Sequence, residues 1–319
     1  MRSSHWLLLL FAAPLCAQVG IERAESHVSV TIDGKPFTTL YCGPETGKPY
    51  LHPLRSASGT IVTRHYPMEN VPGETHDHPH QRGLWFSHGN VNGFDFWANE
   101  PSQHGGKNTR IALKSLGRTA SGSKSGTIEA TFDWLDPQGG TLLTEARRMT
   151  FYSDPANRTI DFDITLTPVK KVTFGDTKEG TFAIRLAAAL EESTKYSLPA
   201  PKRTGRMVDS EGRRGEEQVW GHRASWVDYF GEIDGEKVGI AILDHPSNPR
   251  HPTYWHSRSY GLFAANIFGW HDFLNDTTAD GSMTLDSGHS IRFRYRVIIH
   301  PGDSSSARIA AEFAKFAGE

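Results

Sequence analysis

Residues 126–169 read "GTIEATFDWLDPQGGTLLTEARRMTFYSDPANRTIDFDITLTPV" and carry the clearest alternation of apolar and polar side chains in the chain. Apolar side chains occupy every second position between 126 and 136 and again between 158 and 169. These positions are Ile128, Ala130, Phe132, Trp134, Ile160, Phe162, Ile164 and Leu166. Because successive side chains of a strand point to opposite faces, this period of two predicts strands with one buried face. Turn sequences at 137–140 and 154–157 separate the strands and favour antiparallel pairing.

The same pattern extends over most of the chain. The segment 27–41 alternates, turns at Asp33-Gly34 and alternates again, which is typical of a β-hairpin. Further strands are predicted within 180–190, 224–233, 236–245, 260–269 and 289–300. Helical spacing is convincing only in 304–318, where serines precede an apolar face. Residues 18–319 are therefore predicted to form a single all-β domain, a large antiparallel β-sandwich with a C-terminal helix.

The first 17 residues have the pattern of a cleaved export signal. Arg2 precedes the apolar stretch "WLLLLFAAPL" (6–15), and Leu15-Cys16-Ala17 provides a cleavage site with small residues. The apolar stretch is too short to span a bilayer, which takes about 20 residues. We therefore expect a signal peptide at 1–17, a periplasmic or secreted mature chain, and no membrane insertion after signal removal. A formal net charge of −2 offers no electrostatic basis for binding nucleic acid. Removal of the signal leaves one cysteine, Cys42, so no intrachain disulfide is expected.

The sixteen histidines are unevenly distributed along the chain. Seven lie within 52–104 and five within 222–271, whereas none lies within 105–221, where the alternation is plainest. Both clusters are rich in glycine and proline and resemble loops, which often carry function on a rigid scaffold. The two clusters would share a site if early and late strands are neighbours in a sheet.

The first cluster, "THDHPH" at 75–80, is compatible with a metal site. Residues two apart on a strand face the same side, and three imidazoles suit zinc and other transition metals. Pro79 interrupts such a strand, and Gln81 stands where cupin-type metal sites place a glutamate. One divalent metal ion on His78 and His80 is therefore kept as an alternative, beside imidazoles that only bond the backbone.

The same imidazoles also suit proton transfer, because histidine titrates near neutral pH. Arg82 could hold a carboxylate or sugar hydroxyls through its planar guanidinium. The neighbouring aromatic side chains could stack on a sugar ring or belong to the β-sheet core. The substrate-binding residues predicted in this region are Arg82, Trp85, Asn92 and Trp97.

The second cluster lies within 243–270 and combines histidine, arginine and aromatic side chains. Its predicted catalytic residues are His245, beside the possible orienting carboxylate Asp244, and His256. Its predicted substrate-binding residues are Arg250, Trp255 and Arg258. Glu179, directly before the strand predicted at 180–190, is the candidate catalytic carboxylate, although a charge at a strand edge fits equally well.

Four motifs in order resemble a family of exported bacterial proteins labelled PmoA, or methane oxygenase PmoA, and otherwise described as a domain of unknown function. They are "HPL" (52–54), "DHPHQRGLWFSHGNVNGFDFW" (77–97), "KEGTFAIRL" (178–186) and "DHPSNPRHPTYWHSRSYGLFAANIFG" (244–269). The first family motif usually reads Asp-His-x-His-His-Arg-Gly, and here Gln81 replaces the second of the paired histidines. Methane monooxygenase subunits are integral membrane proteins, so we judge methane oxidation physically unsuited to this chain. At the level of fold, the long alternating pattern looks like the galactose-mutarotase-like supersandwich of aldose mutarotases and related carbohydrate-active proteins.

These patterns predict an exported carbohydrate-active enzyme that acts on a sugar or sugar-derived ring. Histidine and carboxylate groups would catalyse the reaction as acid and base, in the manner of an epimerase, lyase or hydrolase. Its partner would be a small-molecule or oligosaccharide substrate. Two alternatives remain open, a histidine-ligated metalloenzyme and a non-catalytic carbohydrate-binding module.

Overall fold

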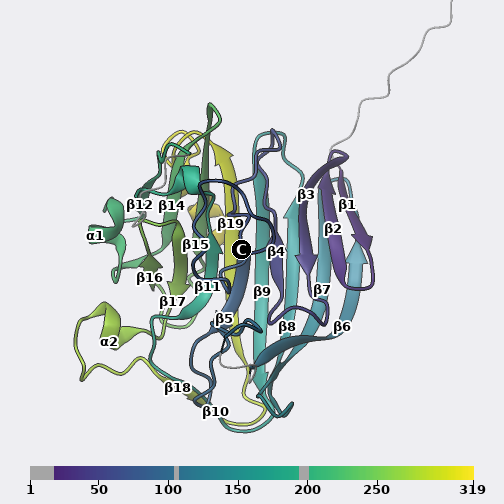
Figure 1. Cartoon of the computed structure of the whole chain (residues 1–319), viewed down its shortest axis with the longest axis vertical. Helices are drawn as coiled ribbons and strands as arrows, with labels where there is room; N and C mark the ends of the chain where they lie inside the picture. Colours follow the sequence, from purple (N-terminus) through teal and green to yellow (C-terminus); the bar gives the residue numbers. More distant parts are fainter. Residues whose placement is uncertain (1–17, 104–107, 194–200) are drawn as a thin grey trace, which may run out of the picture.

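Two large antiparallel β-sheets pack face to face in the computed structural model (Figure 1), which describes residues 18–103, 108–193 and 201–319. The predicted fold class, an antiparallel β-sandwich with a C-terminal helix, is confirmed. The predicted signal peptide and His104 lie outside the described residues.

The first sheet has nine strands in the described part of the chain. In spatial order they are β1 (Val19–Arg23), β2 (His27–Ile32), β3 (Lys35–Tyr41), β4 (Tyr50–His52), β5 (Leu84–His88), β11 (Gly180–Arg185), β17 (Leu262–Asn266), β16 (Thr253–Ser257) and β13 (Arg223–Ala224). The second sheet has eight described strands. In spatial order they are β12 (Arg206–Asp209), β14 (Trp226–Ile233), β15 (Glu236–Asp244), β19 (Ile291–Pro301), β9 (Arg158–Pro168), β8 (Thr141–Tyr152), β7 (Ser125–Leu135) and β6 (Arg110–Ala120). A small pair joins β10 (Val172–Phe174) to β18 (Met283–Leu285).

The segment 126–169 forms β7, β8 and β9, which are consecutive neighbours in the second sheet. Burial along β9 alternates at every residue, as the period of two predicts. The hairpin predicted at 27–41 is also present, as β2 and β3. Its turn residues Asp33 and Gly34 both have positive φ, 55° and 73°, a conformation that suits the twist of two-residue hairpins.

Aromatic side chains from both sheets meet in the space between them. Phe182 of β11 contacts Phe162 of β9 with ring centroids 4.8 Å apart, and Phe86 of β5 contacts Phe293 of β19 at 5.5 Å. All four are at most 3% exposed. Burying each such side chain contributes about 1.5–3 kcal/mol, so this shared core holds the two sheets together.

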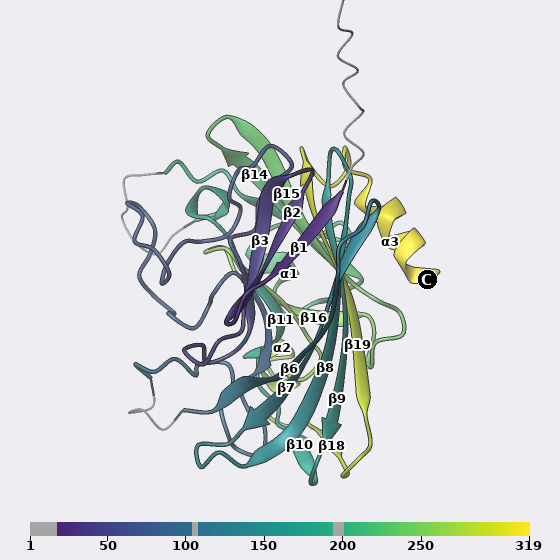
Figure 2. The same ribbon diagram turned by 90° about the vertical axis from the view of Figure 1, so that its right-hand side faces the viewer.

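The outer faces of the two sheets are covered differently (Figure 2). Helix α3 (Ile309–Ala317) packs on the second sheet, where Ile309 and Phe316 join a cluster with Trp226 and Leu243. This helix starts later than the predicted 304–318, because Ser306 and Asp303 bond each other in a tight turn. The other described helices are short, namely η2 (Ala188–Leu190), α1 (Gly215–Val219) and α2 (Trp270–Phe273). None of the described helices is long and apolar enough to cross a membrane.

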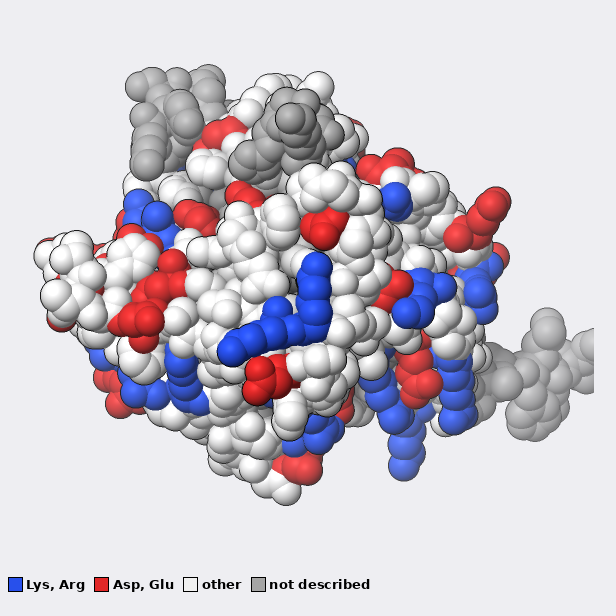
Figure 3. Space-filling view, turned by 90° about the horizontal axis from the view of Figure 1, so that it is seen from below, with Lys and Arg blue, Asp and Glu red and all other residues white. Residues whose placement is uncertain are grey.

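Long loops cover the outer face of the first sheet, on the left in Figure 2. As a result β5, β11 and β17 are buried along their whole length, and their sequences lose the alternation seen in the second sheet. Seen from below, side chains of both charge signs are interspersed on the described surface (Figure 3).

Candidate functional site

On the outer face of the first sheet, side chains of neighbouring strands form a row. The side chains at the ends of this row are large, and those in its centre are small. Tyr50 pairs with Trp85, Trp85 with Ala183, Ala183 with Ala264, and Ala264 with His256. Because neighbouring strands lie about 4.8 Å apart, Trp85 and His256 are roughly 14 Å apart with only two alanines between them. Strand order β5-β11-β17-β16 thus brings the early and late histidine clusters to one face, which we call the outer-face site.

Two indole rings form one end of the outer-face site. Trp85 and Trp97 have ring centroids 5.1 Å apart, and each is 1% exposed. Asp95 positions Trp97 by accepting its backbone N–H at 2.7 Å. The indole nitrogens of both tryptophans have no hydrogen-bond partner among the described residues. A buried donor without a partner costs free energy, and both of these N–H groups lie covered by the protein.

A series of ring contacts continues from these indoles. His80 lies 6.4 Å from Trp97, and His78 lies 5.7 Å from His80. The His78 ring then stacks on Tyr260, with centroids 5.7 Å apart and planes 8° from parallel. Tyr260 packs against the apolar cluster that contains both alanines of the row. The outer-face site therefore combines aromatic faces with imidazoles, a combination suited to a ring with polar substituents.

Two buried arginines hold the loop that carries these histidines. Arg64 donates to Asp77 Oδ1 at 2.8 Å and to the His78 carbonyl at 2.9 Å. Arg185 donates to Asp77 Oδ1 at 3.3 Å and to the side-chain oxygen of Gln81. Burial raises the pKa of Asp77, but the hydrogen bond from His78 and the charge of Arg185 outweigh it and hold this pKa well below its usual range. Asp77 is therefore a fixed negative charge at neutral pH.

Asp77 also orients His78. Its Oδ2 accepts from His78 Nδ1 at 2.8 Å, so the ring proton lies on Nδ1 and the Nε2 lone pair is left for another partner. The His78 side chain is 41% exposed. An imidazole held through its rear nitrogen by a carboxylate has the arrangement of a general base.

His80 and His256 are buried, and they carry the ring proton on different nitrogens. The Gln103 amide donates to His80 Nδ1 at 3.1 Å, which places the His80 proton on Nε2. His256 Nδ1 instead donates to the Lys178 carbonyl at 2.9 Å, which leaves a lone pair on its Nε2. Burial lowers the pKa of His80 to about 2, helped by the charge of Lys48, and lowers that of His256 to about 3. Both rings are neutral at pH 7, one a donor and the other an acceptor.

Glu179 lies directly before β11, close enough to His78 for their charges to interact. Burial raises the pKa of its carboxyl group, outweighing the nearby charges of Lys178 and His78. Its side chain is 38% exposed and lies 3.6 Å from Lys178 Nζ. A carboxyl group with a raised pKa within electrostatic range of an oriented imidazole is suited to acid–base chemistry.

No sequence pattern singled out Lys48, yet it lies at this site. It is 1% exposed and donates to the Trp97 carbonyl at 2.8 Å and to Asn99 Oδ1 at 2.9 Å. Burial lowers its pKa to about 8 although the charge of Glu100 opposes this. Its two bonds fix the backbone beneath Trp97, and no local pattern distinguishes such a lysine from a surface one.

The predicted substrate-binding arginines near the site already have protein partners. Both oxygens of Glu100 accept from Arg82, at 2.9 and 2.6 Å, and the Arg82 guanidinium lies over the Tyr50 ring. Arg258 pairs with Glu216 at 3.0 Å and lies 5.8 Å from the Tyr260 ring centre. Both side chains therefore support aromatic rings of the site in this structure.

Four predicted site residues lie elsewhere. His245 directly follows β15 of the other sheet, where it contacts Phe316 of α3. Arg250 donates to the backbone carbonyls of Ile267, Gly281 and Ser282, and so holds a loop. Trp255 is adjacent to His256 in the sequence but points into the core, and Asn92 joins a surface turn to β10.

Among the described residues, no group of three or more His, Cys, Asp or Glu side chains is placed to hold a metal ion. Asp77 occupies Nδ1 of His78, and Gln103 occupies Nδ1 of His80. The proton of His80 lies on its remaining nitrogen, so that nitrogen offers no lone pair to a metal. In this arrangement the two histidines are hydrogen-bonding groups.

The chain is similar to several solved structures. One is a GH36 α-galactosidase from Geobacillus stearothermophilus, with 11% identity and a TM-score of 0.39, for which the match covers 90% of this chain and 41% of that chain. Two are galactose mutarotase-like proteins, from Lactobacillus casei (8% identity, TM-score 0.40, covering 88% of this chain and 100% of that chain) and Clostridium acetobutylicum (10% identity, TM-score 0.40, covering 89% and 98%). No function follows from such likenesses of fold.

No curated protein matches the sequence. A family model, described as a family of unknown function (DUF6807), matches residues 27–314. The match extends from β2 into α3 and includes every residue of the outer-face site. The chain belongs to this family of unknown function, DUF6807.

Proposed function

We propose that this protein is a carbohydrate-active enzyme that moves protons to and from a sugar or sugar-derived ring at the outer-face site. One observation carries the proposal: His78, oriented by Asp77, interacts electrostatically with Glu179, whose carboxyl group has a raised pKa. Removing one proton and delivering another requires such a pair of groups.

The pKa values indicate which polar residues transfer protons and which bind the substrate. The protonated forms of His80 and His256 are scarcely populated at neutral pH, so neither ring acts as a general acid. They would instead bind substrate hydroxyls, because a hydroxyl group both donates and accepts. Proton transfer is assigned to His78 and Glu179, with Asp77 as a positioning residue.

The aromatic residues would bind the body of the substrate. A sugar ring has apolar C–H faces and a polar rim, and the outer-face site has a partly exposed ring in Tyr260, which stacks on His78. Trp85 and Trp97 are buried and support this end of the site through His80. His78 and Glu179 are the exposed polar groups, so a sugar ring would bind over them.

The test is a panel of neutral, oxidised and reduced sugars incubated with the protein and followed by NMR, which detects epimerisation, elimination and hydrolysis alike. We expect turnover in the wild type and a loss of about 10²-fold or more in the His78→Ala and Glu179→Gln variants, the usual contribution of a general acid or base. His76→Ala is the matched control, because His76 lies in the same loop, is exposed and stacks only on Tyr66.

Other results would redirect the proposal. Saturable sugar binding without product, dependent on Trp85 or Trp97, would identify a carbohydrate-binding module instead. Stoichiometric metal in untagged protein, lost on His78→Ala, would support a metalloenzyme. Export, expected from residues 1–17, also remains a proposal, and cell fractionation of the natural host would test it.

A further inference from the structure

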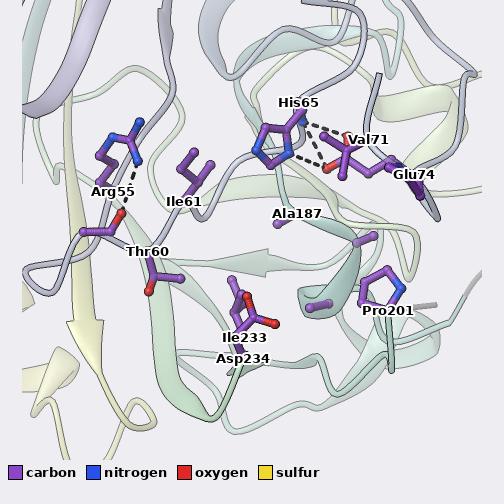
Figure 4. A pocket seen from close by; sticks show the side chains of 14 residues that line it. Arg55, Thr60, Ile61, His65, Val71, Glu74, Ala187, Pro201, Ile233 and Asp234 are labelled. Carbon is purple, nitrogen blue, oxygen red and sulfur yellow. Dashed lines mark hydrogen bonds and ion pairs between the residues drawn. The ribbon is translucent and has the colours of Figure 1, made fainter. Parts of the chain in front are cut away.

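A cavity in another part of the fold shares no residue with the outer-face site. Its volume is about 510 Å³, and it lies between the loops at 55–61 and 65–74, helix η2 and the β14–β15 hairpin (Figure 4). Apolar side chains form most of its wall, among them Ile61, Val71, Pro201 and Ile233. Small-molecule sites typically have this size and a mostly apolar wall with a few polar groups.

Arg55 brings a positive charge without an ionic partner to this wall. Its only hydrogen bond among the described residues runs from Nη1 to the Gly59 carbonyl at 3.2 Å, and no described carboxylate lies within ion-pair distance. Guanidinium has five N–H donors, so most of them remain for a ligand. The hydroxyl of Thr60 is already engaged, since it donates to Glu236.

His65 adds a firmly held acceptor to the same wall, because its Nδ1 proton bonds Glu74 and leaves the lone pair on Nε2. Glu74 accepts from His65 Nδ1 at 2.9 Å and from the backbone N–H groups of His65 and Tyr66, which fixes the ring. This bond to Glu74 is the main reason why the pKa of His65 is raised, although burial and the charge of Arg55 oppose it. In Figure 4 the ring nitrogen that does not face Glu74 lies on the side of Ile61 and Arg55.

One carboxylate without a partner among the described residues also lines the cavity. Asp234, at the turn between β14 and β15, is exposed and has no ion-pair or hydrogen-bond partner among the described residues. Figure 4 places Asp234 beside Ile233 and away from His65. The cavity therefore combines the guanidinium donors of Arg55, an apolar wall, and acceptors at His65 and Asp234.

We propose that this cavity is a binding site for a small hydroxy acid of the sugar-acid class. Its carboxylate would bind Arg55, its carbon skeleton would lie against Ile61 and Ile233, and its hydroxyl groups would donate to His65 Nε2 and to Asp234. Charge-assisted bonds from guanidinium to carboxylate are among the strongest polar contacts in proteins, so the acid group dominates recognition. This site is independent of the proposed catalytic function.

The experiment is isothermal titration of the protein with D-galacturonate, and with D-galactose as the neutral counterpart. We expect galacturonate to bind, galactose to bind this site at least tenfold more weakly, and Arg55→Met to weaken galacturonate binding at least tenfold. Arg118→Met is the matched control, because Arg118 is an exposed arginine of β6. Ala188→Leu, which adds volume inside the cavity wall, should also abolish binding. Thermal melting of each variant checks that it folds.

The result that separates the two sites is the behaviour of Glu179→Gln. Unchanged galacturonate binding in this variant supports the second site, whatever becomes of turnover. Loss of binding in Glu179→Gln but not in Arg55→Met would place the acid at the outer-face site and overturn the inference while leaving the proposed function intact. Equal affinities for galacturonate and galactose in the wild type, or equal affinities of Arg55→Met and Arg118→Met, would overturn it as well.

Discussion

Replacing Asp77 by asparagine tests how the outer-face site is held together. The carboxylate accepts from Arg64 at 2.8 Å, from Arg185 at 3.3 Å, from the Thr75 hydroxyl at 2.8 Å and from His78 at 2.8 Å. Both arginine side chains are at most 1% exposed. Asparagine has nearly the same shape, so the change removes the negative charge and leaves two buried guanidinium groups without it.

The expected loss of stability follows from that burial. Removing one partner of a buried ion pair costs about 3–5 kcal/mol, and because Asp77 is 17% exposed we expect a value near the lower end. In a domain of this size, each kcal/mol shifts the melting temperature by about 2–4 °C, so Asp77→Asn should melt roughly 6 °C or more below the wild type.

The assay is urea unfolding at pH 7 followed by tryptophan fluorescence. Asp133→Asn is the matched control, since Asp133 pairs with Lys114 at 3.1 Å on the surface, where the lysine is 51% exposed. Such a surface pair contributes about 0–1 kcal/mol. A stability loss for Asp77→Asn no larger than that of Asp133→Asn would refute the role assigned to the two buried arginines.

The pH dependence offers a second check of the same reasoning. The pKa of Asp77 is depressed in the folded protein, so its contribution is fully present above its unfolded pKa of about 4 and is lost as the pH falls through the folded value. Wild type and Asp77→Asn should therefore differ by a constant amount from pH 5 to 8 and converge only in strong acid. A difference that disappears between pH 7 and 5 would contradict this assignment.

Four further predictions concern other parts of the fold. Ile164→Ala, at a fully buried position of β9, should cost about 2–5 kcal/mol in urea unfolding, and a loss below 1 kcal/mol would contradict its place in the core. Phe316→Ala should uncover the second sheet beneath α3 and cost about 3 kcal/mol by the same assay; an unchanged midpoint would mean that α3 contributes little. Burial lowers the pKa of His300, but the carboxylate of Asp228 at 3.0 Å raises it more. The pair therefore stabilises the fold fully below the unfolded pKa of about 6.5, and this stabilisation is lost as the pH rises through the folded value. Melting curves from pH 6 to 9 should show this slope in the wild type and lose it in Asp228→Asn, and identical slopes would reject the pairing. Trp97→Phe removes an unpaired buried N–H, so melting should change little while affinity for the sugar found in the panel falls several-fold; unchanged affinity would remove that group from the binding site.

Trp255 and His256, which are adjacent in the sequence, show where sequence reasoning was limited. Both were singled out for the site, but adjacent residues of a strand point to opposite faces, and only His256 faces outward. A shift of one residue in pairing would reverse them. The register of β16 on β17 makes that choice, and the segment itself carries no alternation that could have predicted it.

Long-range pairing explains the other differences. Arg250 resembled a substrate-binding arginine because its three carbonyl partners follow it by 17 to 32 residues along the chain. Arg185 and Lys48 were overlooked because the groups that they bond lie in other segments of the chain. Gln81, which departs from the family motif, accepts a hydrogen bond from Arg185, a contact that only the folded chain makes.

Local sequence patterns are enough to predict the β-sandwich, the hairpin at 27–41 and the C-terminal helix. These features follow from local rules, namely side-chain period, turn residues and helix spacing, which act within about ten residues. The folded arrangement sets which histidines share a face, which ring nitrogens carry their protons, and why the pKa of Glu179 is raised. Those properties depend on the strand order β5-β11-β17-β16 and on burial by distant loops, because desolvation and hydrogen bonds between remote segments set the chemistry of each group.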